Sequence, residues 1–308
     1  MGKLSDLATA KIPFFFITDF LGQKIEVYTQ SELEDHNIFF DFNYHVQPHN
    51  LTLTTIPMCF QEYQKGFDKI IQAIKRGETY VLNFTQPTKL KTTHTLKEIY
   101  TKANARFKLF YKDQFVSFSP EPFITIVDNT ISTFPMKGTI DASIPNAQNI
   151  ILDDPKEHAE HTMVVDLLRN DLSLVATKVE VKKFRYVEKI QAGEKELLQI
   201  SSRIQGTLPT NWKENLDTII TKLLPAGSIS GAPKRSTVEH IQAIENYDRG
   251  FFSGVMGYFN GEKLTSSIMI RFIERTDAGL VYKSGGGITI DSDAKKEYDE
   301  MLAKIYIP

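Results

Sequence analysis

The stretch Phe134-Pro135-Met136-Lys137-Gly138-Thr139 determines how the fold and the site of this chain are interpreted. The apolar run 131–136 predicts a strand, and Gly138 marks the turn after it, so Lys137 stands at the end of a rigid element. Most Lys-Gly pairs are solvated turns, and this pair alone is a weak signal. A nucleophilic lysine needs a neutral amine, which burial favours and neighbouring carboxylates oppose.

Carboxylates flank the lysine in sequence. Glu121 precedes it, between two prolines, and Glu157 and Glu160 follow it. Asp153-Asp154-Pro155 predicts the start of a helix that runs to about Leu168, because proline and acidic residues favour a first helical turn. Residues three apart share a helical face, so Glu157 and Glu160 lie together. Taken alone, this helix is best explained as having a solvated acidic face.

A second Glu-x-x-Glu pair, Glu297 and Glu300, occurs on the predicted helix 293–305, where Lys304 shares its face. The preceding run Gly285-Gly286-Gly287, after a predicted strand, allows close approach of a ligand and can present amide hydrogens to an anion. Oxygen-only carboxylate sites suit magnesium. Two interpretations stay open: a magnesium-bridged carboxylate ligand, or two charged helix faces and a flexible turn.

Softer metal ligands give no strong indication of a site. His158 and His161 share a helical face, but the segment is not the His-Glu-x-x-His pattern of zinc proteases, so zinc is disfavoured. Cys59 has no second cysteine with which to pair, and its isolation from other soft ligands argues against a thiolate site. We expect Cys59 to be a buried structural thiol.

Composition is that of an ordinary globular protein. The 308 residues are 41% hydrophobic and 24% charged, which is enough to bury a substantial core. A formal net charge of -2 provides no basic footprint for nucleic acid or for an anionic membrane surface. No apolar run approaches the length of a membrane span. We therefore expect a cytoplasmic protein that handles any anionic ligand through local charges.

The periodicity of the chain predicts a mixture of helices and strands. Predicted strands and helices, in chain order, are a hairpin over 12–28, a helix over 61–75, a strand over 80–84, a helix over 95–107, and strands over 115–118, 124–127 and 131–134. Consecutive strands without intervening helices favour an antiparallel sheet. The residues alone support only a mixed α and β class.

The motifs together resemble those of the chorismate-utilising enzymes. They are Ser119-Pro120-Glu121, Pro135-Met136-Lys137-Gly138-Thr139, the segment 154–172, the small-residue loop 227–234, and Gly285-Gly286-Gly287-Ile288 followed by Glu297-Tyr298-Asp299-Glu300. That family includes the large subunits of anthranilate synthase and aminodeoxychorismate synthase, the isochorismate synthases and the salicylate synthases. The resemblance extends from about Tyr63 to the last residue.

The resemblance implies an α+β fold of two stacked, largely antiparallel β-sheets flanked by outer helices. It implies one chorismate-binding domain over 1–308, with a short N-terminal strand region at 1–60 and a catalytic core at 61–308. Three positions separate the activities within the family. Lys137 is typical of aminodeoxychorismate synthases. By the same resemblance, Leu82 stands where isochorismate and salicylate synthases have a water-activating lysine, and Gln199 stands near a histidine of anthranilate-forming members.

The family's roles can be carried over to particular residues. The resemblance implies that Lys137 is the nucleophile and Glu121 the general acid. It implies magnesium ligands at Glu160 and Glu300, with Glu157 and Glu297 in support. The implied substrate-binding residues are Gly138, Thr139, Arg271, Gly285, Gly286, Gly287 and Lys304.

The activity implied is that of aminodeoxychorismate synthase component I, which converts chorismate and ammonia to 4-amino-4-deoxychorismate for para-aminobenzoate and folate biosynthesis. No segment resembles a glutaminase, so ammonia is expected from a glutamine amidotransferase subunit or from solution. Two alternatives stay open: an anthranilate synthase large subunit, and a non-catalytic chorismate-binding protein. The joint presence of an acid and an amine argues against the second alternative.

Overall fold

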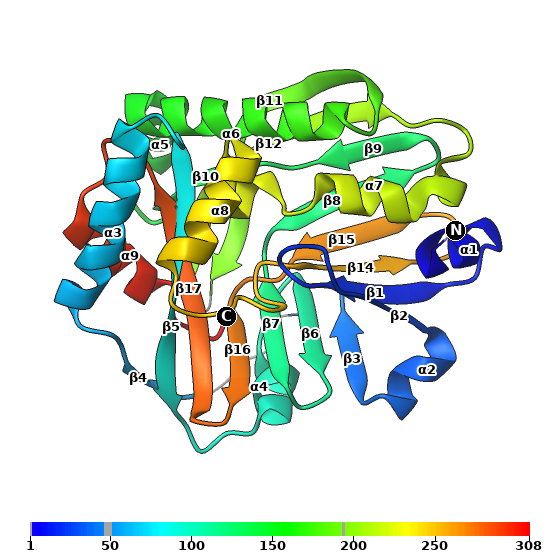
Figure 1. Ribbon diagram of the computed structural model, residues 1–308, viewed down its shortest axis with the longest axis horizontal. Coiled ribbons are helices and arrows are strands. Elements are labelled where there is room, and N and C mark those ends of the chain that lie inside the picture. The colour runs from blue at the N-terminus through cyan, green and yellow to red at the C-terminus, as the bar shows by residue number, and fades with distance from the viewer. Residues whose placement is uncertain (1, 46–50, 193–194) are drawn as a thin grey trace.

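Two antiparallel β-sheets form the centre of the molecule (Figure 1). The computed structural model describes residues 2–45, 51–192 and 195–308. The 9-stranded sheet has the order β10-β12-β9-β8-β15-β14-β1-β2, with β11 paired to β12. Its strands are β1 (Phe14–Thr18), β2 (Ile25–Thr29), β8 (Pro122–Val127), β9 (Thr130–Thr133), β10 (Met136–Asp141), β11 (Thr177–Ala192), β12 (Lys195–Thr207), β14 (Val255–Phe259) and β15 (Leu264–Ile268).

The 8-stranded sheet has the order β13-β5-β17-β16-β7-β6-β3, with β4 paired to β5. Its strands are β3 (Ile38–Asp41), β4 (Thr54–Ile56), β5 (Val81–Lys91), β6 (Phe107–Tyr111), β7 (Phe115–Ser119), β13 (Gly231–Ala232), β16 (Phe272–Thr276) and β17 (Gly279–Ile288). The predicted class, α+β with two antiparallel sheets, is confirmed.

Helices cover the outside of the sheets. They are α1 (Lys3–Thr9), α2 (Gln30–Asp35), α3 (Phe60–Lys75), α4 (Leu96–Lys102), α5 (Ala147–Asp153), α6 (Pro155–Ser173), α7 (Leu216–Leu223), α8 (Lys234–Ile244) and α9 (Ala294–Ala303), with short 3-10 turns η1 (Trp212–Asn215) and η2 (Gly227–Ile229). Figure 1 shows α6 along the top of the molecule, and α3 and α9 at its left side. None of the helices in the described residues is both long enough and apolar enough to span a membrane.

Two of the points at which the chain passes from one sheet to the other are neighbours. β7 of the 8-stranded sheet continues into β8 of the 9-stranded sheet through Glu121. β15 returns the chain to β16 through a segment that includes Arg271. The two crossovers are joined by backbone hydrogen bonds from Ile268 to Glu121 (3.2 Å) and from Phe118 to Arg271 (3.2 Å). We call this junction the seam.

Alternation along β1 shows how the sheets are buried. Phe14 and Phe16 belong to one apolar cluster, whereas Phe15 and Ile17 belong to another, and all four are fully buried. Successive strand residues point to opposite faces, so the 9-stranded sheet is covered on both sides here. Each fully buried side chain of this size contributes about 1.5–3 kcal/mol through the hydrophobic effect.

The structure departs from several local expectations. The helix predicted over 95–107 ends at Lys102, because Phe107 is taken up by β6 in a ladder with β7 and β3. The helix expected to stop near Leu168 continues to Ser173. Cys59 is exposed, directly before α3, so the expectation that it would be buried is wrong.

Two expectations about the motifs are also corrected. Lys137 does not follow a strand; it lies inside β10, where the register with β12 shifts between Met136 and Thr139. The run 285–287 is not a turn after a strand, because all three glycines belong to β17 and pair with β5. Both motifs therefore sit on sheet backbone, which fixes them more firmly than loops would.

An ion pair between Glu245 and Arg249 is buried beside β5. The two side chains are 1% and 2% exposed, and their closest atoms are 2.7 Å apart. Arg249 also donates to the carbonyls of Asn83 and Ile229, and Glu245 accepts from the backbone amide of Thr85. These bonds tie β5 to the segment around η2.

Replacing Arg249 with methionine should lower the free energy of unfolding by about 3–5 kcal/mol, because Glu245 would stay buried without its counter-charge. Equilibrium unfolding in urea measures the change. Arg235, whose side chain is 95% exposed beside Glu239, provides the matched control. Its replacement by methionine should change the free energy by less than about 1 kcal/mol. Equal losses in the two variants would contradict the assignment of stability to the buried pair.

Candidate active site at the seam

Lys137 is fixed through its backbone as well as through its side chain. Its carbonyl oxygen lies 3.3 Å from Nδ1 of His161, a fully buried residue on α6, and Nε2 of the same ring is 2.7 Å from the hydroxyl of Ser202 on β12. The Lys137 Nζ lies 2.8 Å from Oε2 of Glu160. The helix and the strand therefore hold the amine against a carboxylate.

The charge state of this amine follows from two opposing effects. Burial lowers the pKa of Lys137, but the negative charge and the hydrogen bond of Glu160 outweigh burial and raise it. Glu300 and Glu157 act in the same direction. Lys137 is thus a charged ammonium in this structure, and it needs to lose its proton before it can act as a nucleophile.

The first acidic pair lies beside Gly138. Glu157 Oε2 is buried and has no hydrogen-bond partner within the described part of the chain. Burial raises the pKa of Glu157, and the negative charge of Glu160 adds to the effect. A Cβ at position 138 would lie 2.8 Å from that oxygen, and the backbone there has φ = 90°. Glycine at this position therefore leaves room for the carboxylate.

The second acidic pair lies on α9 beside the glycine run of β17. A Cβ at Gly286 would be 3.5 Å from Oε2 of Glu297 and 3.7 Å from Oε1 of Glu300. Lys304 Nζ is 2.8 Å from Glu300 Oε1 and donates to the carbonyl of Gly285 at 2.8 Å. Burial raises the pKa of Glu297.

The two acidic pairs belong to one electrostatic cluster. The charge of Lys137 on β10 acts on the pKa values of Glu157, Glu297 and Glu300, which lie on α6 and α9. The resemblance implied that both Glu-x-x-Glu pairs would serve one site, and in the structure the charge of one lysine acts on members of both pairs.

Glu121 occupies the first crossover, and its carboxyl group is desolvated. Burial raises the pKa of Glu121 above its ordinary value. A hydrogen bond from the Ser228 hydroxyl to Oε1 (2.6 Å) and the charges of Arg271 and Lys304 oppose that rise. The result is a carboxylic acid that keeps its proton to a higher pH than an exposed glutamate does.

Arg271 occupies the second crossover with a left-handed backbone, φ = 52°. Its guanidinium lies over the ring of Tyr306, 5.2 Å from the ring centroid. Its Nε is buried and lacks a hydrogen-bond partner among residues 2–45, 51–192 and 195–308. A guanidinium with a free donor in a desolvated position is suited to bind a carboxylate of a ligand.

The glutamates around Lys137 match the predicted magnesium ion in ligand type. The four glutamates offer only oxygen ligands, which suit a hard cation, and Glu157 Oε2 is buried without a hydrogen-bond partner among the described residues. Within the described ranges, however, no three His, Cys, Asp or Glu side chains converge closely enough to form a ready cation site. Glu160 and Glu300 are instead paired with Lys137 and Lys304. The residue types fit magnesium, and the ion stays a proposal.

A family model described as chorismate binding enzyme matches residues 41–308 of this sequence. The chain belongs to the chorismate-binding enzyme family.

Individual relatives of this chorismate-binding enzyme fall into more than one group. An uncharacterised PabA-like protein of Pasteurella multocida (strain Pm70) is 46% identical over 304 residues, 96% of this chain and 94% of that protein. Aminodeoxychorismate synthase component 1 of Bacillus subtilis (strain 168) is 31% identical over 265 residues, 81% of this chain and 55% of that protein. The crystal structure of anthranilate synthase component I from Streptococcus pneumoniae TIGR4 has a TM-score of 0.70 and 25% identity, over 83% of this chain and 59% of that chain.

The remaining predicted substrate-binding positions differ in their surroundings. Gly285 and Gly287 lie in β17 opposite Thr85 and Asn83 of β5, and a Cβ at Gly285 would be 2.1 Å from the carbonyl oxygen of Phe84. Thr139 is exposed on β10 and pairs with Gln199 of β12. In this chorismate-binding enzyme, Thr139 and Gln199 are thus neighbours of the strand segment that carries Lys137.

The side chain of Leu82 does not lie where the resemblance implied a water-activating group. Its side chain is fully buried in the large apolar cluster and takes no part in the site. Side chains alternate along β5, so Val81 has the other orientation, and its Cγ2 would lie 3.7 Å from a Cβ at Gly287. Val81, unlike Leu82, therefore lies beside the glycine run of β17, as Thr85 does. An aliphatic side chain there cannot activate water either.

Several contacts of the site were not predicted. Ser228 was part of a quoted motif, but only the fold brings it to Glu121. His161 was considered as a metal ligand, whereas it holds the backbone of Lys137. Tyr306 had no sequence signal at all. Amphipathic spacing identifies faces, and it does not show which distant loop reaches them.

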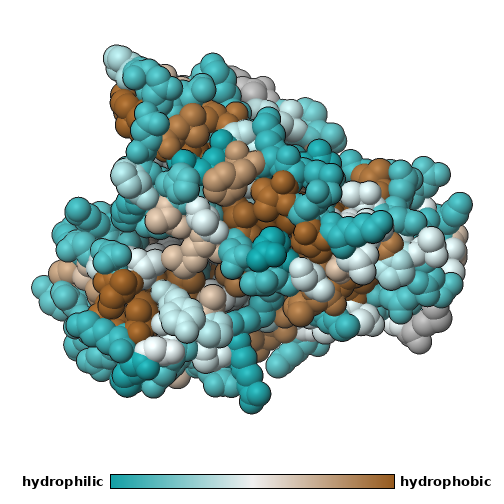
Figure 2. Space-filling model, turned by 90° about the horizontal axis from the view of Figure 1, so that it is seen from above, coloured by the Kyte–Doolittle hydropathy of each residue, from teal (hydrophilic) through white to brown (hydrophobic). Residues whose placement is uncertain are grey.

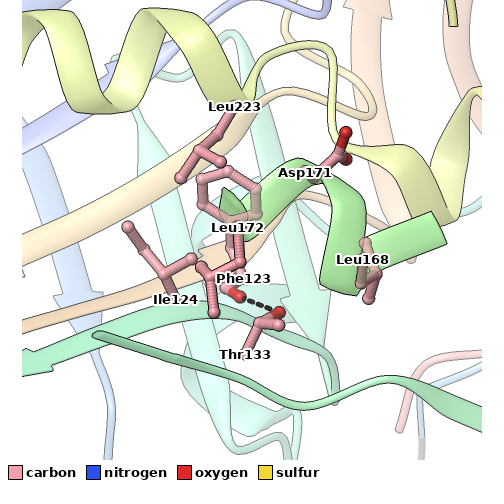
Figure 3. A pocket seen from close by; sticks show the side chains of 7 residues that line it. All are labelled: Phe123, Ile124, Thr133, Leu168, Asp171, Leu172 and Leu223. Atoms are coloured by element: carbon pink, nitrogen blue, oxygen red, sulfur yellow. Dashed lines mark hydrogen bonds between the residues drawn. The ribbon is translucent and has the colours of Figure 1, made fainter. Parts of the chain in front are cut away.

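A small apolar cavity lies behind the site of this enzyme. It is lined by Phe123, Ile124, Thr133, Leu168, Asp171, Leu172 and Leu223 (Figure 3). The Thr133 hydroxyl already donates to the carbonyl of Phe123. Asp171 is paired with Lys234, with 2.9 Å between their closest atoms. Thr133 and Asp171 therefore already have partners, and neither polar group of the lining is free to bind a ligand.

Proposed function

We propose that this chain is the chorismate-binding subunit of an aminodeoxychorismate synthase, which replaces the C4 hydroxyl of chorismate with an amino group. The position of Lys137 carries the proposal: its amine contacts Glu160 in the acidic cluster, and the charge of Lys304 acts both on that amine and on the desolvated acid Glu121. The cationic side chains of Arg271 and Lys304 lie near that acid, and their charges lower its pKa.

The proposed reaction uses the lysine and the acid in turn. The neutral amine of Lys137 forms a bond to ring carbon C2, the ring double bonds shift, and the C4 hydroxyl leaves as water with the proton of Glu121. Ammonia then bonds to C4, the double bonds shift back, and the bond to Lys137 breaks. The proton that the new amino group loses returns to Glu121. Chorismate and ammonia become 4-amino-4-deoxychorismate and water.

Substrate binding would rest on the seam and on the glycine strand. Chorismate carries two carboxylates, and Arg271 has an Nε without a partner in the described residues. Lys304 is held at the end of α9 by Glu300 and by the carbonyl of Gly285. These two cations would bind and orient the dianion, while Gly286 leaves room beside the α9 carboxylates.

Magnesium would be held by Glu160 and Glu300, with Glu157 and Glu297 in support. When bound, it would supply Lewis-acid polarisation at the ring carboxylate of the substrate. Glu160 raises the pKa of Lys137, so the amine would lose its proton more easily when Glu160 no longer pairs with it.

Ammonia would come from a glutamine amidotransferase partner or from solution, and the product would feed para-aminobenzoate and folate synthesis. The test is to incubate the purified chain with chorismate, magnesium and ammonium at mildly alkaline pH. We expect a product with the mass of 4-amino-4-deoxychorismate, which aminodeoxychorismate lyase consumes. Anthranilate with pyruvate, or no product even when a glutamine amidotransferase subunit is added, would overturn the proposal.

Chelation should distinguish a metal-dependent reaction from one that uses only the chain's own charges. We expect EDTA to abolish product formation and added magnesium to restore it. Glu300→Gln should raise the magnesium concentration needed for half-maximal rate, because a carboxylate ligand is lost. The control is Glu239→Gln, an exposed carboxylate paired with Arg235. An EDTA-resistant rate would contradict the metal proposal while leaving the lysine chemistry intact.

The alternative is an anthranilate synthase large subunit, which the Streptococcus pneumoniae structure keeps open. Two residues favour the proposal over it. Lys137 supplies an amine where anthranilate-forming members usually have alanine. Gln199, opposite Thr139 in the ladder of β10 and β12, stands near the position where those members tend to have a histidine. Product analysis in the same incubation separates the two activities.

A further inference from the structure

Ser228 is the only residue of the loop 226–234 whose side chain is known from the described contacts to reach the acid. Its hydroxyl donates to Oε1 of Glu121 at 2.6 Å, a short distance for a hydrogen bond between two oxygens. The backbone amide of Glu121 is bound separately by the Ser119 hydroxyl at 3.1 Å. The carboxyl group and the main chain of Glu121 therefore have different partners.

The backbone on either side of Ser228 is anchored by buried charged side chains. The amide of Gly227 donates to Asp171, which is 9% exposed and paired with Lys234. The carbonyl of Ile229 accepts a hydrogen bond from Arg249 at 3.0 Å. Figure 3 shows Asp171 at the end of α6, pointing away from the apolar cavity.

Gly227 permits this arrangement, because a Cβ there would lie 2.7 Å from Oδ2 of Asp171. Two independent ion pairs, one from α6 and one from the segment after α8, thus restrain the backbone on both sides of a single serine. A hydroxyl that only faced solvent would not require its backbone to be fixed on both sides. Such a restraint is what a group requires if it must hold another side chain in one orientation.

A protonated carboxyl group has two different oxygens, and only the oxygen that bears hydrogen can donate it. Oε1 accepts the hydrogen bond of the Ser228 hydroxyl. In a carboxylic acid, the carbonyl oxygen is the oxygen suited to that acceptor role. We propose that Ser228 is a positioning residue for Glu121: it fixes Oε1 as the acceptor and leaves Oε2 to deliver the proton to the departing hydroxyl. This inference rests on the proposed function of Glu121 as the general acid.

The expected kinetic effect follows from the loss of one hydrogen bond and of the fixed orientation. Ser228→Ala should lower kcat by about tenfold to a hundredfold with little change in KM, since a hydrogen bond to such a group is worth that factor. Ser228→Thr keeps the hydroxyl and should restore most of the rate. The matched control is Ser230→Ala, because Ser230 is fully buried in the same loop but donates to the carbonyl of Ala226.

The pH dependence provides a readout that a general loosening of the loop would not change. Three groups oppose the effect of burial at Glu121, namely Ser228, Arg271 and Lys304, and each lowers its pKa. Removing the Ser228 hydroxyl therefore raises the pKa, and the acid stays protonated to higher pH. The falling alkaline limb of the pH profile should move to higher pH in Ser228→Ala and stay in place in Ser230→Ala.

Infrared spectroscopy tests the contact without any turnover. The carbonyl stretch of protonated Glu121 is identified as the band that Glu121→Gln removes, and its disappearance is followed as pH rises. We expect the midpoint to move to higher pH in Ser228→Ala alone. If the midpoint and the alkaline limb are the same in the wild type and Ser228→Ala, the positioning proposal is overturned. If the band shifts as expected but no aminodeoxychorismate forms in the wild type, the function is wrong and the contact is right.

Discussion

Lys137→Ala should abolish the formation of 4-amino-4-deoxychorismate, lowering the rate by at least about a thousandfold, because removing a covalent nucleophile eliminates the step that it performs. The structure gives the lysine a fixed place for that step. Its carbonyl is bound by His161 and its amine by Glu160. The measurement is product formation from chorismate and ammonium, with product identified by mass.

Two further variants separate nucleophilicity from charge pairing. Lys137→Arg keeps a cation beside Glu160 but has no amine that loses its proton at working pH, so it should be as inactive as the alanine variant. Lys156→Ala provides the matched control, since Lys156 also contacts Glu160, at 3.6 Å, yet its side chain is 65% exposed. Recovery of the rate in the arginine variant would show that position 137 contributes only charge.

Glu121→Gln should lower kcat by about a hundredfold to ten-thousandfold, the usual contribution of a positioned general acid. Glutamine has nearly the same shape and can still accept the hydrogen bond of Ser228, but it has no proton to give. The variant should also lose the alkaline limb of the pH profile. Burial raises the pKa of Glu121, so the wild type is active below that pKa and loses activity as pH rises through it.

Glu26→Gln is the control for a general effect of replacing a half-buried carboxylate. Glu26 also accepts hydroxyl hydrogen bonds, from Tyr28 and Tyr111, and it lies on β2 within the part of the chain that precedes the site residues. We expect it to lower stability without changing the pH profile of the reaction. A Glu121→Gln variant that keeps the wild-type rate and limb would remove Glu121 from the mechanism.

Sequence patterns were most informative where a single helix or strand determines how its residues are placed. The Glu-x-x-Glu spacing on α6 and α9 placed each pair on a single face, and the charge of Lys137 acts on members of both pairs. The antiparallel class followed from strands without intervening helices. In contrast, the place of the glycine run inside β17 depends on its pairing with β5, which no local signal reports.

The rest of the site depends on contacts between distant parts of the chain. Ser228 and Glu121 are 107 positions apart, and His161 and Lys137 are 24 apart. Leu82 shows that a short distance along the chain can also mislead, because moving one residue along a strand changes the face on which a side chain lies. Such facts follow from register and packing, which the sequence determines only through the whole fold.

The face of the molecule formed by α5, α6 and β11 carries exposed apolar side chains. Exposed large apolar residues on the upper elements include Ile150, Met163 and Phe184. Figure 2, which looks down on α6 and β11, shows apolar residues in separate patches among hydrophilic ones. Scattered apolar side chains of this kind are normal on a folded protein.

The two crossovers at the seam have a consequence for anyone who wishes to transplant this chemistry. Glu121 and Arg271 stand where the chain leaves one sheet and enters the other, and backbone hydrogen bonds join the two connections. A designer cannot graft them as a loop, because their separation is set by how the two sheets meet. A borrowed scaffold would have to reproduce both sheets and both connections before any side chain was chosen.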